Sequence, residues 1–192
     1  QLFGSLFVGP TWMAWRVVLK AVFGLSVLDE AEWALFHQLT GRTQAPTQQA
    51  REAFVIVGRR GGKSRIAALI AVYLACFRSY TTVLAAGERG VIMLIASDRR
   101  QARVLKRYVS GFLNAVPMLA QMIVSETAEG IELNNRIIIE IHTASFRSTR
   151  GYTVVAAILD EMAFWPTDDA ASPDTEILNA LRPAMATVPG AL

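Results

Sequence analysis

The stretch from Gly58 to Ser64 reads Gly-Arg-Arg-Gly-Gly-Lys-Ser and contains the residue types that a triphosphate site requires. Glycines let backbone N–H groups approach phosphate oxygens closely, and a following helix adds the positive end of its dipole. We expect Lys63 to contact the β and γ phosphates and the Ser64 hydroxyl to bind Mg²⁺. The stretch departs from the consensus G-x-x-x-x-G-K-[ST], because Val57 holds the first glycine position.

Two carboxylates follow a second apolar run. Val154 to Leu159 is uniformly apolar and leads directly into Asp160 and Glu161. An aspartate at the end of a buried strand can hold Mg²⁺ beside the loop serine, and an adjacent glutamate can take a proton from an attacking water. Alone, such an acidic pair is more typical of a helix cap. Downstream of the glycine-rich loop, it predicts a site that hydrolyses ATP with Mg²⁺.

Several basic and polar residues complete the predicted site. Arg59 could neutralise charge that develops on the γ-phosphate, whereas Arg60 is expected to play a structural role. Gln48 and Gln49 precede the first apolar run and could contact adenine, although polar loops contain such residues by chance. The predicted nucleotide contacts are Gly58, Arg59, Arg60, Gly61, Gly62, Lys63, Ser64, Arg65 and Gln49, with Ser64 and Asp160 for the metal.

The elements that must position these residues follow from the hydrophobic pattern. The sequence predicts strands at 53–57, 91–95 and 154–159, with helices over 66–77, 98–114 and 175–186. The run 130–143 predicts a hairpin that turns at Asn134 and Asn135. Alternating strands and helices indicate an α/β fold with a mostly parallel sheet flanked by helices and a β-hairpin insertion. Residues 1–40 are expected to form two short helices packed on this core.

Composition excludes several classes of protein. Apolar residues make up 53% of the 192 residues and charged residues 18%, which is typical of a folded globular chain. No apolar run reaches the roughly 18–20 residues that span a bilayer, so no membrane association is expected. The single cysteine, Cys76, excludes a disulfide framework and fits a reducing cytosolic setting. The formal charge of +3 permits a nucleic-acid partner.

The sequence resembles the ATPase domain of viral (tailed bacteriophage) large terminases from about Gly41 to its end. The loop 58–64 is similar to that family's variant Walker A motif, and 155–161 to its Walker B motif. Arg150-Gly151 resembles an arginine-glycine pair before the second motif, and Ala96-Ser97-Asp98 with Gln101-Ala102 resembles the segment after the family's second strand. The resemblance implies a P-loop NTPase fold of the RecA (ASCE) type, and a motor that uses ATP to move double-stranded DNA into a procapsid.

The resemblance also implies partners and missing parts. It implies a ring of five subunits on the portal protein in the host cytoplasm, with a small terminase subunit as a further partner. It also implies that Arg150 is a finger that reaches a neighbour's ATP. A loop-stabilising or solvated Arg150 is the alternative. It further implies that residues 41–192 are an ATPase core ending before a coupling strand and a nuclease domain. The fragment could then be a monomer and hydrolyse ATP poorly.

Two rival functions stay open at this point. A helicase-like, nucleic-acid-dependent ATPase would use the same site, and a regulatory nucleotide-binding module would turn over little ATP. The expected helix from Asp98 carries a basic face that could track DNA or could be an ordinary solvated face. Its cations are Arg99, Arg100, Arg103, Lys106 and Arg107. His37 and His142 lack the spacing of metal ligands.

Overall fold

The computed structural model of the chain describes residues 2–25, 29–144, 151–165 and 173–192. The chain divides into two compact units, residues 1–56 with Leu192 and residues 57–191. Within the described residues, no helix is both long and apolar enough to cross a membrane. The predicted division at residue 40, and the packing of residues 1–40 on the core, stay predictions.

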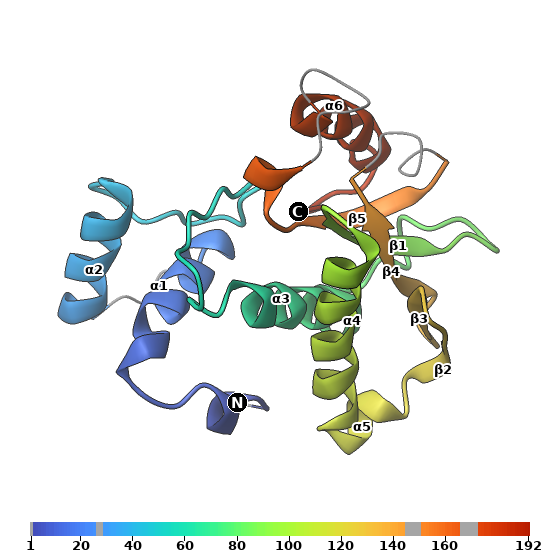
Figure 1. Cartoon of the computed structure of the whole chain (residues 1–192), viewed down its shortest axis with the longest axis horizontal. Helices are drawn as coiled ribbons and strands as arrows, with labels where there is room; N and C mark the ends of the chain where they lie inside the picture. The colour runs from blue at the N-terminus through green and yellow to red at the C-terminus, as the bar shows by residue number, and fades with distance from the viewer. Residues whose placement is uncertain (1, 26–28, 145–150, 166–172) are drawn as a thin grey trace. The chain divides into compact units, whose positions relative to one another are not determined.

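The first unit is helical (Figure 1). Two 3-10 turns, Gly4–Leu6 and Pro10–Trp12, precede helix α1 (Met13–Val22), and helix α2 covers Glu30–Thr40. The Asp29 side chain accepts a hydrogen bond from the backbone N–H of Glu32 and so caps α2, which ends at Gly41 in the left-handed conformation. An ion pair between Lys20 and Glu32 connects the two helices. Both helices were predicted.

The second unit is built on one five-stranded sheet in the order β2-β3-β4-β1-β5. The strands are β1 (Gly90–Ala96), β2 (Ile123–Glu126), β3 (Gly130–Leu133), β4 (Ile137–Thr143) and β5 (Thr153–Leu159). Strand β1 pairs in parallel with β4 and β5, whereas β2–β3 and β3–β4 are antiparallel. Every residue of β1 is buried, as expected for a central parallel strand with both faces covered.

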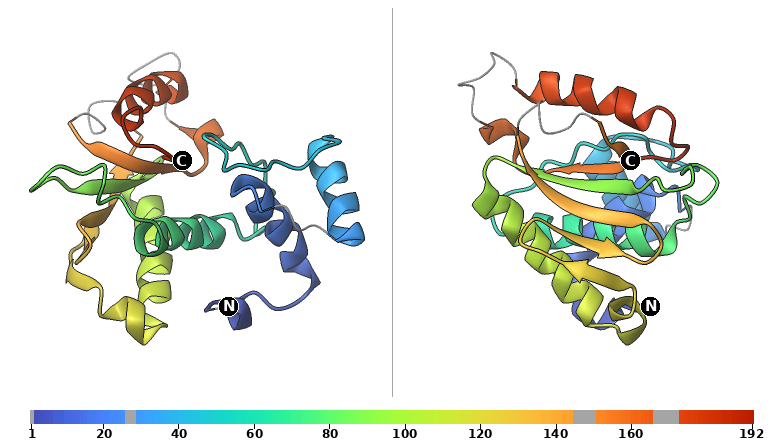
Figure 2. Two further views of the ribbon diagram at one scale, coloured as in Figure 1. Left: turned by 180° about the vertical axis from the view of Figure 1, so that it is seen from behind. Right: turned by 90° about the vertical axis from the view of Figure 1, so that its right-hand side faces the viewer.

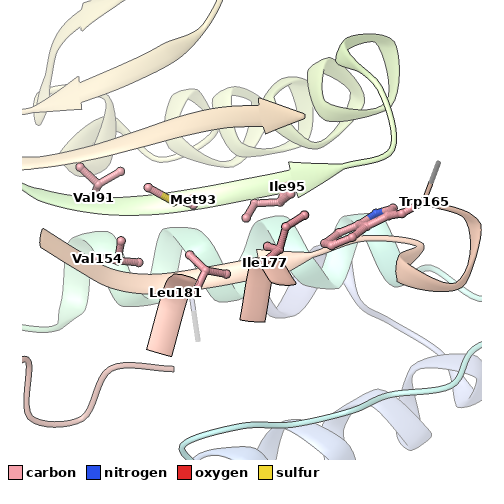
Figure 3. Packing of buried hydrophobic residues seen from close by; sticks show 7 residues of the cluster. All are labelled: Val91, Met93, Ile95, Val154, Trp165, Ile177 and Leu181. Atoms are coloured by element: carbon pink, nitrogen blue, oxygen red, sulfur yellow. The ribbon is translucent and has the colours of Figure 1, made fainter. Parts of the chain in front are cut away.

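Helices cover both faces of this sheet (Figures 1 and 2). Helices α3 (Lys63–Phe77) and α4 (Arg99–Asn114) pack on each other and on one face, while α6 (Pro173–Met185) packs against β5 on the other. Short helices α5 (Pro117–Ala120) and η4 (Met162–Phe164) follow α4 and β5. The α6 layer closes a core seen in Figure 3, formed by Val91, Met93, Ile95, Val154, Trp165, Ile177 and Leu181.

The α/β class and three of the predicted helices are confirmed, but the hairpin differs from its description as an insertion. Its two strands, β3 and β4, do pair in antiparallel fashion. However, β4 lies between β3 and β1 and belongs to the sheet itself. Strand β2, which adds a further antiparallel pairing at the edge, was not predicted. In the turn, Arg136 rather than an asparagine has the positive φ of 68°.

The predicted strand at 53–57 is wrong in this structure. Residues 52–58 have no regular secondary structure, and Phe54 and Ile56 are 70% and 103% exposed. A strand needs a neighbour to pair its backbone N–H and C=O groups. Each described strand pairs only with its neighbours in the order β2-β3-β4-β1-β5. Strand β5 therefore lies at the edge of the sheet, and the apolar run 53–57 pairs with no described strand.

Candidate nucleotide-binding site

The acidic pair lies where β5 ends, beside the end of β1. Because β1 and β5 are parallel, their carboxyl ends meet at the same edge of the sheet. The Asp160 N–H donates to the Ile95 carbonyl at 2.8 Å, which extends the ladder one residue past β5. The Trp165 ring nitrogen donates to the Asp160 carbonyl at 3.0 Å, and Trp165 is itself buried. Asp160 is therefore held through its backbone on both sides.

The glycine-rich loop turns tightly before α3. The Gly58 carbonyl accepts from the Gly61 N–H at 3.2 Å, and the Gly62 carbonyl accepts from the N–H groups of Arg65 and Ile66 at 3.1 Å. Gly62 caps α3 with φ 84°, a conformation that glycine adopts without strain. The loop thus ends at the N-terminus of a 15-residue helix, whose dipole favours a bound anion there.

Val57, at the position of the missing glycine, packs closely against Gly61 of the same loop. A Cβ atom added to Gly61 would lie 2.4 Å from Cγ1 of Val57. The Val57 side chain therefore fills the space beside residue 61, and glycine at 61 makes that close approach possible. A larger residue at 61 would therefore collide with Val57.

Two contacts join the loop to the acidic pair across nearly a hundred residues of sequence. Lys63 Nζ lies 2.5 Å from Glu161 Oε1, and the Ser64 hydroxyl donates to Asp160 Oδ2 at 3.2 Å. The Lys63 and Glu161 side chains are 31% and 30% exposed, so the pair is open to solvent on one side. Four of the residues predicted from the sequence to form the site therefore meet at one point.

The environment shifts the acidity of Asp160. Burial raises the pKa of its carboxyl group, and the nearby Lys63 ammonium and the Ser64 hydroxyl only partly oppose that shift. A carboxylate held in such a position gains from a cation that would restore its charge. Together with the Ser64 hydroxyl it supplies hard oxygen ligands, and Mg²⁺ commonly takes only one or two protein ligands besides phosphates and water. The residues present therefore fit the predicted magnesium site.

Glu161 adopts an unusual backbone conformation. Its φ of 56° and ψ of 38° are left-handed, which is uncommon for a residue with a side chain. The conformation lets the chain leave β5 and enter η4, where the Phe164 N–H donates to the Glu161 carbonyl at 2.8 Å. Such local strain is often found at functional positions.

The remaining predicted site residues are placed less directly. Arg59 and Arg60 are exposed and have no hydrogen bond or ion pair among the described residues, and Arg60 has φ 61°. Arg65 is half-buried at the start of α3. Gln49 belongs to the first unit, so its adenine role stays a prediction. Arg150 lies outside the described residues.

One residue of the site was missed by sequence reasoning. The Trp165 ring nitrogen donates to the Asp160 carbonyl. Trp165 also belongs to the core that α6 covers, where Figure 3 shows it with Ile177 and Leu181. Its only sequence signal is a tryptophan placed a few residues after the acidic pair. Within the described residues, no cluster of three or more His, Cys, Asp or Glu side chains could hold a metal independently of phosphate.

A glycine-rich loop at the start of a helix, facing an acidic pair at the end of a parallel strand, defines an α/β protein of the P-loop NTPase class. The family described as "Terminase large subunit, ATPase domain" matches residues 34–185, which is more than half of the chain. The chain belongs to this family. Among curated proteins, none is significantly similar to it.

The chain also aligns with solved structures of large terminases. The large terminase of bacteriophage HK97 aligns with 93% of this chain at 18% identity and a TM-score of 0.54. The ATPase domain of a Thermus phage large terminase, in a mutant form, aligns with 78% of the chain at 18% identity. The TM-score of this second alignment is 0.49. The chain spans 36% of the HK97 protein and 64% of the Thermus phage domain.

Proposed function

We propose that this chain hydrolyses ATP as the motor domain of a viral DNA-packaging terminase. The observation that carries the proposal is the pair of contacts between the start of α3 and the end of β5, Lys63 with Glu161 and Ser64 with Asp160. These contacts support a site in which a phosphate-binding cation, a hydroxyl, a metal-binding carboxylate and a general base would act on one γ-phosphate. Family membership supports the same activity.

The residues take separate roles in hydrolysis. The N–H groups at the start of α3 and the Lys63 ammonium bind the phosphates, and Ser64 and Asp160 would hold Mg²⁺. When bound, Mg²⁺ neutralises phosphate charge. Glu161 accepts a proton from the water whose oxygen bonds to the γ-phosphorus, while the bond to the β-phosphate bridging oxygen breaks and ADP leaves. The Lys63–Glu161 ion pair has to open for both side chains to act.

Two arginines are proposed to stabilise the transferring phosphoryl group. Arg59 is exposed within the loop and is proposed to act on its own subunit's ATP. Arg150 is proposed to act on a neighbour's ATP in the assembled ring. Mixed rings of Arg150→Ala and Glu161→Ala subunits of the whole protein test this, since a role in trans restores some hydrolysis and a role in cis restores none.

Glu161→Gln is the decisive variant for the proposed chemistry. It keeps the shape of the side chain but removes the base, so ATP turnover should fall about 10²-fold or more. Affinity for ATP, measured by fluorescence titration, should stay within a few-fold of the parent. The exposed Glu30→Gln on α2 changes the charge equally and should leave turnover unchanged. Undiminished hydrolysis by Glu161→Gln would remove Glu161 as the base.

The finer functional assignments follow from the family. We propose double-stranded DNA as the polymer that is moved, with the portal protein and a small terminase subunit as partners, and a five-membered ring in the host cytoplasm as the working assembly. A helicase-like ATPase is less favoured, because the family match is to terminases. A regulatory nucleotide-binding module would show ATP binding without turnover, which the same titration and hydrolysis measurements distinguish.

A further inference from the structure

Helix α4 separates its side chains into an apolar face and a cationic face. Its buried residues, Ala102, Leu105, Val109, Phe112 and Leu113, pack toward the sheet. At about 100° per residue, the five cations among its first nine residues fall within an arc of about 120° on another side of the helix. Those cations are Arg99, Arg100, Arg103, Lys106 and Arg107. They extend over about 12 Å of the helix axis.

The cationic face borders a hollow of about 560 Å³ beside the β2–β3 turn. Its lining consists of Arg100, Arg103, Lys106, Arg107 and Ala128. Four of these five residues carry a positive charge. The lining contains no aromatic ring among the described residues, and the exposed Tyr108 is not part of it.

Only part of this charge is neutralised within the chain. Glu129 lies 2.8 Å from Arg99 and 3.8 Å from Arg103, and Glu126 lies 2.6 Å from Lys106. Arg100 and Arg107 have no carboxylate partner among the described residues. Seven residues apart, they lie on the same side of α4, about 10 Å apart along its axis. A solvated helix face usually carries alternating positive and negative side chains. On α4, by contrast, Arg100 and Arg107 line the same hollow without a carboxylate partner among the described residues.

The cationic face is also connected to the candidate nucleotide site. Strand β1 ends at Ala96, and α4 starts three residues later with Asp98 as its cap, accepting from the Gln101 N–H at 2.9 Å. The same end of β1 accepts the Asp160 N–H through the Ile95 carbonyl. Two residues, Ala96 and Ser97, separate Ile95 from the cap of α4.

We propose that Arg100 and Arg107 of α4, with the neighbouring hollow, bind the phosphate backbone of double-stranded DNA; the choice of partner rests on the proposed motor function. Duplex DNA carries about one charge per 1.7 Å, or about seven charges along 12 Å, which matches a row of clustered cations. Recognition of single strands relies on aromatic rings that stack on bases, and the lining of this hollow has none. The contact is with backbone phosphates and so is independent of sequence.

The test measures binding of the 192-residue chain to a fluorescent duplex of about 30 base pairs between about 50 and 200 mM NaCl. The double variant Arg100→Ala/Arg107→Ala should bind at least about tenfold more weakly at the lower salt concentration. Losing two phosphate contacts should also reduce the slope of log K against log salt by about 1.8. Both side chains are exposed, so Tm should be unchanged, and Arg100→Gln/Arg107→Gln provides a second, helix-compatible pair.

The matched control is Arg42→Ala/Arg51→Ala, which removes the same charge from two exposed positions in the first unit. It should leave the affinity within about threefold, since neither side chain belongs to the cationic face of α4. Absence of duplex binding by the parent, an equal loss in the control, an unchanged α4 variant or tighter binding to a single strand of the same length would each overturn the proposal. Basal ATP hydrolysis, measured on the same samples, reports separately on the proposed function.

Discussion

At the scale of single residues, the candidate site depends on a carboxyl group whose ionisation opposes folding. Burial is the largest influence on Asp160 and raises its pKa, despite Lys63 and the hydrogen bond from Ser64. A raised pKa in the folded chain means that the neutral acid is favoured there. The stability that the Asp160 carboxyl group contributes is therefore fully present below the ordinary pKa of an aspartate. It is lost as the pH rises through the higher pKa that Asp160 has in the folded chain.

Asp160→Asn should therefore stabilise the chain at neutral pH while abolishing hydrolysis. The asparagine oxygen can still accept from Ser64, and no charge has to be held in a half-buried position. Because the group is partly exposed, the gain should be small, with a Tm rise of about 2 °C at neutral pH. Thermal unfolding followed by circular dichroism measures it.

The pH dependence is the sharper part of that prediction. The Tm difference between Asp160→Asn and the parent should shrink toward zero as pH falls below about 4, where aspartates are neutral in both folded and unfolded states. Glu176→Gln, at an exposed carboxylate of α6, should show no comparable gain at neutral pH. A gain for Asp160→Asn that persisted at acid pH would contradict the role of ionisation.

At the scale of elements, the connection after α1 is constrained by a close backbone approach. Gly24 has φ 65°, and a Cβ atom there would lie 2.4 Å from the carbonyl carbon of Gln48. The chain next to this point is tied back to α1, because the Ala50 N–H donates to the Val22 carbonyl at 2.8 Å. Gly41, at the end of α2, has the same φ but no atom within 4 Å of such a Cβ.

Substituting Gly24 and Gly41 by alanine distinguishes the cost of a strained backbone from the cost of a steric clash. Gly41→Ala should cost about 1 kcal/mol of unfolding free energy, the strain of a left-handed alanine. Gly24→Ala should cost about 3 kcal/mol, since the backbone of Gln48 must also move. Urea unfolding of the two variants measures both values. Equal costs would show that the segment at Gln48 yields without penalty.

The elements also show what the sequence could and could not predict. Helix α4 was predicted with its cap because Asp98 and the apolar spacing are local signals. The place of β4 in the sheet was not, because its Ile137, Ile139 and Ile141 are buried while the residues between them are half-buried. That alternation is typical of a hairpin with one face open to solvent. The place of β4 in the main sheet follows only from its pairing with β1, which is distant in sequence.

The candidate site was predictable only where its residues belong to local sequence motifs. Lys63, Ser64, Asp160 and Glu161 are each specified by short motifs, and the contacts Lys63–Glu161 and Ser64–Asp160 join the two motifs. The close approach of Val57 to Gly61 and the hydrogen bond from Trp165 to the Asp160 carbonyl depend on how the local backbone turns. Neither has a sequence pattern of its own.

At the scale of the whole molecule, the main disagreement concerns the apolar run before the glycine-rich loop. Its residue types predict a buried strand, whereas the structure leaves Phe54 and Ile56 exposed and without regular structure. An exposed apolar run gains nothing from the hydrophobic effect, so its side chains should contribute little to the stability of this chain. Residues of the central strand β1 are fully buried instead.

Ile56→Thr distinguishes the two arrangements. If residue 56 is exposed in the 192-residue chain, the substitution should change the unfolding free energy by less than about 0.5 kcal/mol. Ile92→Thr makes the same chemical change in β1, where Ile92 is 0% exposed, and should cost about 2 kcal/mol or more through a lost methyl contact and a buried hydroxyl. Denaturant unfolding measures both. A cost for Ile56→Thr that matched Ile92→Thr would place residues 53–57 in the sheet, as the sequence pattern predicts, with β5 no longer at its edge.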